Sequence, residues 1–119
     1  MYGSHFKMVY NQITEGITIK IIRQDEDVVM TEITFKKGSV FPDHIHFSDH
    51  SGYLLKGRLR ISRNGVPRIM MEGDSWCMGK KVPHFTEALE DSVVIEVYSI
   101  EKENPEQIKT PETLAQKQL

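Results

Sequence analysis

The stretch GSVFPDHIHFSDHSGYLLKG, which covers residues 38–57, decides the fold of this chain. It carries three histidines, His44, His46 and His50, between a glycine at each end. Side chains two apart on an extended segment point to the same face, so His44 and His46 would project from one side of a strand. The serine, aspartate and glycine residues around His50 favour a bend there. The pattern predicts a strand that presents histidines, followed by a turn.

A second stretch, GDSWCMGKKVPH, covers residues 73–84 and supplies the fourth histidine of the pattern, His84. Three or four neutral imidazoles that converge inside a barrel would bind a divalent transition metal ion, and Zn, Ni, Mn, Fe, Co and Cu all accept such ligands. A cage of nitrogen donors can leave one or two coordination positions open to a substrate. The alternative is that His44 and His46 lie on a solvated strand and that a backbone carbonyl satisfies His84.

The sequence around these stretches has the pattern of short strands. Apolar residues recur at every second position in residues 17–21 and 93–97, and Gly, Asn, Asp and Pro bound the segments. Asn64-Gly65 favours a two-residue type I′ turn, because both central residues of that turn need positive φ. Pro67 places the next strand at an edge or a bulge, because proline cannot donate to the ladder. About eight or nine such strands in one domain predict an all-β sandwich or barrel.

The length and composition of the chain fit one globular domain. Of its 119 residues, 39% are hydrophobic and 27% are charged, so we expect a single domain over residues 1–119. Its barrel core would cover about residues 17–99, and residues 100–119 would form a polar tail. Thr110-Pro111-Glu112 has the pattern of a helix start, so this tail is either a short C-terminal helix or a loose segment.

Charge and cysteine content exclude several classes of protein. The net charge of −2 provides no basic field for nucleic acid or for an anionic membrane. No apolar run approaches the roughly 18 residues of a membrane helix, and the N-terminus lacks the apolar stretch of a signal peptide. The single Cys77 excludes an intramolecular disulfide and reads as a buried thiol, which fits a reducing compartment. We therefore expect a cytoplasmic protein whose partner is a small molecule.

The spacing of the histidines resembles the two sequence motifs of the cupin family. In the first motif Gly38 is followed by five residues and then by the His44-x-His46 pair, and six residues separate His50 from Gly57. In the second motif, which starts at Gly73, His84 falls at the position of a metal ligand. Four residues depart from the family pattern: His50 replaces an acidic or amide ligand, and Gly79, Lys81 and Ala88 replace proline, glycine and asparagine.

This resemblance covers about residues 17–99, and the short spacing between the motifs is typical of small single-domain bacterial cupins. It implies a barrel of jelly-roll topology, the cupin double-stranded β-helix, with a metal near its open end. The implied ligands of one divalent metal ion are His44, His46, His50 and His84. Family members of this size are commonly homodimers with packed sheets, so a homodimer is the expected assembly.

Residues 83–99 also resemble the small cupins of pectin and alginate breakdown, which act on unsaturated uronates. These proteins carry an acidic, an aromatic and a downstream basic residue here, and Glu96, Tyr98 and Lys102 stand in those places. The resemblance implies that Glu96 and Tyr98 are catalytic and that Lys102 binds substrate. The alternative is that Glu96 and Tyr98 face water, as one face of a strand commonly does. The other face of this strand is fully apolar and would pack in the core or in a dimer interface.

Four arginines, Arg58, Arg60, Arg63 and Arg68, flank the Asn64-Gly65 turn. Alternate arginines on paired strands most often form a solvated face. The alternative is that Arg58 or Arg60 reaches the mouth of the cavity and binds a substrate carboxylate with both ends of its guanidinium group.

Three functions are compatible with these residues. The first is a metal-dependent enzyme that acts on a small carboxylated, sugar-like substrate, with the metal as Lewis acid and Glu96 as proton shuttle. The second is a metal-dependent dioxygenase in which Fe or Mn binds substrate or O₂. The third is a non-enzymatic sensor that holds a small ligand in the barrel. One fold with one metal site hosts many chemistries, so all three stay open here.

Overall fold

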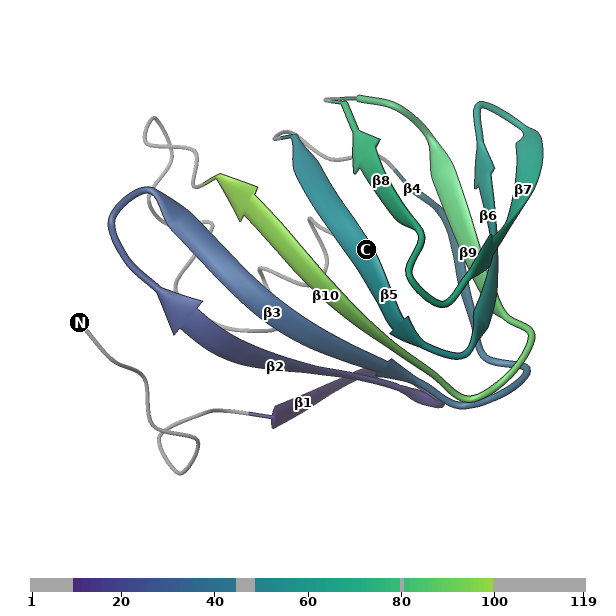
Figure 1. Cartoon of the computed structure of the whole chain (residues 1–119), viewed down its shortest axis with the longest axis horizontal. Coiled ribbons are helices and arrows are strands. Elements are labelled where there is room, and N and C mark those ends of the chain that lie inside the picture. Colours follow the sequence, from purple (N-terminus) through teal and green to yellow (C-terminus); the bar gives the residue numbers. More distant parts are fainter. Residues whose placement is uncertain (1–9, 45–48, 80, 100–119) are drawn as a thin grey trace.

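The structure of the chain is a computed structural model that describes residues 10–44, 49–79 and 81–99 (Figure 1). Within these residues it contains ten strands and no helix, which confirms the all-β prediction with one or two strands more than the sequence pattern indicates. The strands are β1 (Tyr10–Thr14), β2 (Ile17–Gln24), β3 (Val28–Phe35), β4 (Val40–His44), β5 (His50–Lys56), β6 (Arg58–Arg63), β7 (Val66–Met71), β8 (Ser75–Met78), β9 (His84–Ala88) and β10 (Ser92–Ser99). None of the described residues belongs to a helix long and apolar enough to cross a membrane. The predicted helix start at Thr110-Pro111-Glu112 lies outside the described residues.

The strands form two antiparallel sheets that face each other (Figure 1). One sheet has six strands in the order β1-β2-β3-β10-β5-β8, and the other has four in the order β4-β9-β6-β7. From β3 onward the chain passes back and forth between the sheets, so that strands distant in sequence become neighbours. The last strand, β10, lies between β3 and β5. This is the jelly-roll arrangement that the sequence predicts.

The strand β10 shows how alternation sorts side chains between the two faces of a sheet. Ser92, Val94, Glu96 and Tyr98 are buried, whereas the residues between them are half-buried on the opposite face. The face that carries the acid and the aromatic residue is therefore the inner one. The alternative in which Glu96 and Tyr98 face water is therefore wrong, because both side chains are buried. The apolar face of β10 lies on the outer side of the sheet, away from the core.

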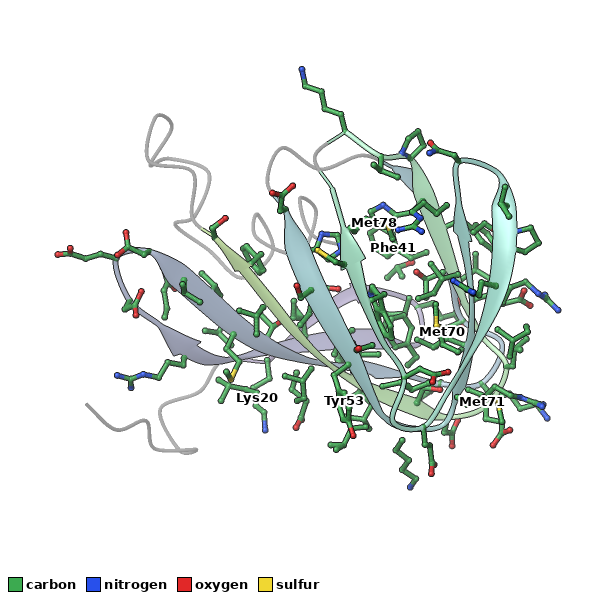
Figure 2. The ribbon with its side chains drawn as sticks, turned by 45° about the horizontal axis from the view of Figure 1, so that its top comes forward. Lys20, Phe41, Tyr53, Met70, Met71 and Met78 are labelled. Atoms are coloured by element: carbon green, nitrogen blue, oxygen red, sulfur yellow. The ribbon has the colours of Figure 1, made fainter. Side chains whose placement is uncertain are left out.

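The inward faces of the two sheets pack together into one core. Figure 2 shows Phe41, Met70 and Met78 between the sheets and Tyr53 on the outer side. The buried members of this core are Ile17, Ile19, Ile33, Phe35, Leu54, Leu59, Ile61, Met78, Ala88 and Val94. Because they come from both sheets, their packing fixes the distance between the sheets. It also fixes the distance between polar side chains that share the inward faces.

The β6–β7 hairpin confirms two predictions from the sequence. Asn64 and Gly65 have φ angles of 53° and 79°, and a type I′ turn requires both to be positive. Pro67 lies in β7, which is an edge strand of the four-stranded sheet and has a ladder on one side only within the described part of the chain. The hairpin therefore follows from local sequence alone.

Gly57 makes the corner at which the chain passes from the six-stranded to the four-stranded sheet. It is the only residue between β5 and β6, and its φ is +99°. A Cβ at this position would lie 2.2 Å from the Oγ of Ser92 and 2.4 Å from the carbonyl oxygen of Asp91. The next residue is held as well, because the backbone N–H of Arg58 donates to the Oγ of Ser92 at 3.0 Å. This corner requires glycine both for its φ and for its space.

We predict that Gly57→Ala lowers the free energy of unfolding by about 3 kcal/mol, because the methyl group adds a steric overlap to the strain of a positive φ. Gly38→Ala is the matched control, since Gly38 has a φ of +87° but no described atom within 4 Å of the position that a methyl group would take. The control should lose only about 1 kcal/mol. Urea denaturation followed by circular dichroism measures both changes. If both variants lose the same free energy of unfolding, the corner relaxes around the added methyl group and its close contacts do not contribute to the loss.

Candidate functional site

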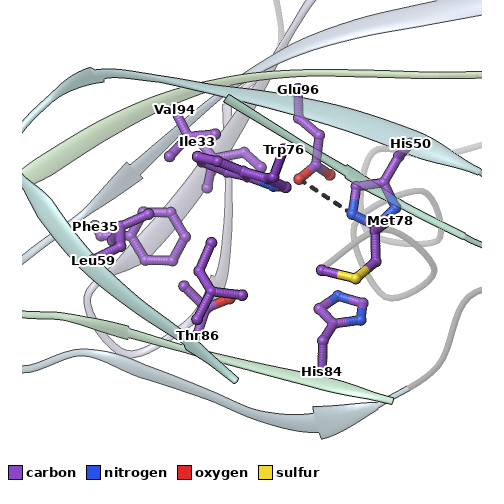
Figure 3. Close-up of a pocket in the computed structure, with 11 residues that line it drawn as sticks. Ile33, Phe35, His50, Leu59, Trp76, Met78, His84, Thr86, Val94 and Glu96 are labelled. Carbon is purple, nitrogen blue, oxygen red and sulfur yellow. Dashed lines mark ion pairs between the residues drawn. The ribbon is translucent and has the colours of Figure 1, made fainter. Parts of the chain in front are cut away.

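A small cavity lies between the two sheets (Figure 3). Its volume is about 20 Å³, which is enough for one water-sized sphere. Four of its lining residues are polar or titratable: His50, His84, Thr86 and Glu96. The other lining residues are Ile33, Phe35, Leu59, Ile61, Trp76, Met78 and Val94. The cavity thus brings together two of the four predicted histidines and the predicted acid.

His50 and His84 come from different sheets and meet across this cavity (Figure 3). His50 begins β5 and His84 begins β9, and each residue is only 3% exposed. Their ring centroids lie 5.5 Å apart, and the ring planes are inclined by 47°. The packing of the sheets therefore places two buried imidazoles side by side, although they are far apart in sequence.

A hydrogen bond determines the tautomer of His84. Its Nδ1 lies 3.0 Å from the carbonyl oxygen of Val82. Because a carbonyl oxygen can only accept, Nδ1 carries the proton and donates it, and the lone pair of the ring is on Nε2. Such a hydrogen bond is usual for metal-binding histidines, whose orientation and tautomer are set by the second ring nitrogen. It also fits the alternative in which a backbone carbonyl satisfies His84, so it does not by itself assign a metal.

Glu96 is a buried carboxyl group beside His50. It is 4% exposed, and its Oε2 lies 3.7 Å from the Nε2 of His50 (Figure 3). Its backbone is held in place by Thr31, whose Oγ1 donates to the carbonyl oxygen of Glu96 at 3.0 Å. Burial raises the pKa of Glu96 well above its usual value, because the charged form loses its hydration. The side chain is thus a carboxylic acid able to keep its proton at higher pH than an exposed glutamate.

Tyr98 lies on the same face of β10 but does not line the cavity. It is 3% exposed and packs in a second small cluster with Val29 and Ile21. Burial, and secondly the nearby Glu96, raise the pKa of the Tyr98 phenol. Its hydroxyl has no hydrogen-bond partner among the described residues. The structure therefore separates the two predicted catalytic residues: Glu96 reaches the cavity and Tyr98 lies beside it.

The other two predicted histidines are described only in part. His44 ends β4, and its backbone lies opposite that of His84 in the β4–β9 register. His46 lies outside the described residues, as does Lys102. Among the side chains that the structure does describe, no three from His, Cys, Asp and Glu are arranged to hold a metal ion. The register thus places the backbone of His44, a third predicted ligand, opposite the backbone of His84.

Arg58 and Arg60 do not reach the cavity. They alternate with the buried Leu59 and Ile61 along β6, so they project from the outer face of the sheet. Each pairs there with a carboxylate: Arg58 Nε lies 3.2 Å from Glu90, and Arg60 binds Glu87. This is the solvated arrangement that alternate arginines most often adopt.

Trp76 is absent from the site that the sequence predicts, yet its indole ring forms one wall of the cavity (Figure 3). The ring lies against Gly52 of the neighbouring strand, where a Cβ would come within 2.3 Å of Cε2 of the indole. The alternation in β8 that turns Trp76 and Met78 inward turns Cys77 outward. The prediction of a buried thiol is therefore wrong, because Cys77 is exposed.

Comparison with known proteins agrees with this fold. Over 92 residues the chain is 30% identical to the pectin degradation protein KdgF of Dickeya dadantii (strain 3937), a match that covers 76% of this chain and 84% of that protein. The structure is similar to that of KdgF from Halomonas sp., with a TM-score of 0.77 and 25% identity over 88% of this chain and 97% of the other. An RmlC-like cupin from Shewanella frigidimarina NCIMB 400 has the same fold, with a TM-score of 0.77 and 19% identity over 87% and 93% of the two chains.

The family assignment covers most of the barrel. The family described as the cupin domain matches residues 31–101, which include both histidine stretches, the corner at Gly57 and the strand that carries Glu96. The sequence pattern, the two facing sheets and these relatives agree, and the chain belongs to the cupin family as a small bacterial cupin that resembles the pectin-degradation cupins.

Proposed function

We propose that this cupin is a metal-dependent enzyme that acts on a small carboxylated, sugar-like substrate of the unsaturated-uronate type. The observation that carries the proposal is the position of Glu96, a buried acid 3.7 Å from His50 in the cavity that His84 also lines. Buried acids beside convergent histidines are costly in a protein core and are typical of catalytic sites. The relationship to a pectin degradation protein supports the choice of substrate class.

The proposed ligands of the metal are His44, His46, His50 and His84, which would bind one divalent transition metal ion such as Zn, Ni, Mn, Fe, Co or Cu. The described residues fit such an ion in three respects. The cavity has room for one small sphere, two buried imidazoles adjoin it, and the tautomer of His84 leaves its lone pair on Nε2. When bound, the ion would supply Lewis-acid chemistry at an oxygen of the substrate.

In this proposal Glu96 acts as the general acid–base. Its raised pKa keeps the carboxyl group protonated in a range where an exposed glutamate would be ionised, so it can donate a proton to the substrate and later take one back. The apolar lining, which includes Trp76 and Val94, limits the access of water to this proton. Tyr98 would contribute indirectly, since it packs beside the cavity and not in it.

The proposed assembly is a homodimer. The outer face of the six-stranded sheet carries exposed apolar side chains, including Met30 at 37%, Tyr53 at 44% and Leu55 at 54% exposure. The half-buried apolar face of β10 lies on the same side of the sheet. A second copy packed there would remove these side chains from water, which would favour association.

The first prediction from this proposal tests the metal ligands. The double variant His44→Ala/His84→Ala should lose metal binding completely, because two remaining imidazoles rarely hold an ion against water and competing solutes. Elemental analysis after dialysis against each candidate metal measures the occupancy. Arg60→Gln, on the outer face, is the control and should bind one ion per chain like the unmodified protein. Full occupancy in a folded double variant would exclude this ligand set.

The second prediction concerns pH. An imidazole must be neutral to coordinate a metal, so the affinity for the metal should decrease as the pH is lowered through the ordinary imidazole range at about pH 6.5. Competition with a chromophoric chelator at a series of pH values gives the affinity. A constant affinity between neutral and mildly acidic pH would indicate ligands other than histidine.

The third prediction tests catalysis. Glu96→Gln keeps the shape of the side chain but cannot exchange a proton, so turnover should fall about a hundredfold or more while the fold and the metal content stay unchanged. Tyr98→Phe should cost less, because Tyr98 lies outside the cavity. The assay is the consumption of an unsaturated uronate at matched metal loading. Equal rates for wild type and Glu96→Gln would remove Glu96 from the mechanism, and tight binding without any turnover would favour the non-enzymatic binding module.

A further inference from the structure

The four arginines near the Asn64-Gly65 turn fall into two groups. Arg58 and Arg60 each have a carboxylate partner on the outer face of the sheet. Arg63 and Arg68 have no carboxylate within ion-pair distance among the described residues. Within the described part of the chain these two guanidinium groups thus lack a carboxylate partner, and both belong to the same hairpin.

Alternation places Arg63 and Arg68 on the inner side of the four-stranded sheet. Along β6 the inner positions are Leu59, Ile61 and Arg63, so Arg63 continues the buried row beyond the end of the core. Arg68 lies opposite Ile61 in the β6–β7 register and thus shares its face. The predicted substrate arginines, Arg58 and Arg60, occupy the other face of the same strand.

Both arginines line a groove between the β6–β7 hairpin and β8. The groove has a volume of about 760 Å³, and no acidic residue among those described lines it. Ile61, Trp76 and Met78 line this groove and also the small cavity of His50, His84 and Glu96, so the groove adjoins the cavity directly. A ligand in the groove would therefore lie beside the proposed reaction centre.

Arg63 is held in position across this groove. Its Nη1 donates to the carbonyl oxygen of Cys77 on β8 at 3.2 Å, so the guanidinium spans from one sheet to the other. One N–H of the five is used in this bond, and the planar fork keeps further donors for an anion. Trp76 and Pro67 add apolar walls to the same groove. This combination of a few fixed polar groups with apolar walls is typical of small-molecule sites.

We propose that Arg63 and Arg68 bind the carboxylate of the substrate, while its sugar ring lies against Trp76. This inference rests on the proposed function for the identity of the ligand as a uronate, but the arginines and the groove do not depend on the metal. Guanidinium groups bind carboxylates with paired hydrogen bonds, and they also bind phosphate. The carboxylate is favoured because the apolar wall suits the ring that carries it.

The test compares a carboxylated sugar with its neutral counterpart on the full chain. Galacturonate and galactose are titrated into the protein, and the fluorescence of Trp76, the single tryptophan of the chain, reports binding in the groove. Galacturonate should bind more tightly than galactose to the unmodified protein. Arg63→Gln/Arg68→Gln should weaken galacturonate binding by about tenfold for each arginine and leave galactose unchanged. Arg58→Gln/Arg60→Gln has the same change of net charge and should bind like the unmodified protein.

Several results would overturn the inference. It fails if the unmodified protein does not prefer galacturonate, if Arg63→Gln/Arg68→Gln binds it normally, or if the outer-face control loses as much affinity. It also fails if galactose binding falls equally, since the arginines would then shape the groove instead of binding the anion. Inorganic phosphate that competes as strongly as galacturonate would overturn it too, because the groove would then be a general anion site. Thermal unfolding of each variant confirms that the fold is retained.

Kinetics separate this inference from the proposed function. With an unsaturated uronate, Arg63→Gln/Arg68→Gln should raise KM with little change in kcat, because the carboxylate contact is the same in the bound substrate and in the transition state. Turnover with an unchanged KM in this variant would leave the proposed function intact and overturn the role of the arginines. If galacturonate binding depends on the arginines but no uronate is turned over, the role of the arginines stands and the proposed enzymatic function fails.

Discussion

Two sheets that can bury their apolar faces only against each other constrain the whole molecule. Each strand contributes every second side chain to the space between the sheets, and where the sheets cover each other these side chains are enclosed whether they are apolar or polar. At one end the inward rows hold Phe35, Leu54, Leu59 and Ala88. At the other end they hold His50, His84 and Glu96. The same packing that stabilises the fold thus holds three titratable groups together out of water.

Burying the carboxyl group of Glu96 between the sheets lowers the stability of the fold. A buried glutamic acid loses hydration, which is the reason that its pKa is raised, and a carboxyl oxygen without a hydrogen-bond partner among the described residues adds to the cost. An apolar residue at position 96 would continue the pattern of Val94 and stabilise the core. The strand instead carries an acid beside His50, in the cavity that His84 also lines. The proton donor that we propose for Glu96 would be a physical reason for accepting this loss.

Both sheets contribute side chains to the cavity and to the groove beside it. The six-stranded sheet contributes His50, Glu96 and the wall formed by Trp76, whereas the four-stranded sheet contributes His84 and the arginines of its hairpin. Between β5 and β6 the chain passes from one sheet to the other through the single residue Gly57, where a Cβ would overlap Ser92 and Asp91. The hydrogen bond from Arg63 to Cys77 links the two sheets directly across the groove. The proposed reaction centre and the proposed binding groove are therefore built from strands that are distant in sequence.

Local sequence determined the strands, the type I′ turn at Asn64-Gly65, the edge position of Pro67 and the membership of the cupin family, because each depends on short-range spacing or on φ preferences. Alternation shows that a strand has two faces, but it does not show which face is inside. The pairing of the strands decided which face is inside, so that Glu96 lines the cavity and Cys77 is exposed to water. It also placed Arg63 and Arg68, and not Arg58 and Arg60, on the inner side of their hairpin. Only the packing of one sheet on the other separated Glu96 from Tyr98, because two residues on one face of a strand meet different neighbours across the core.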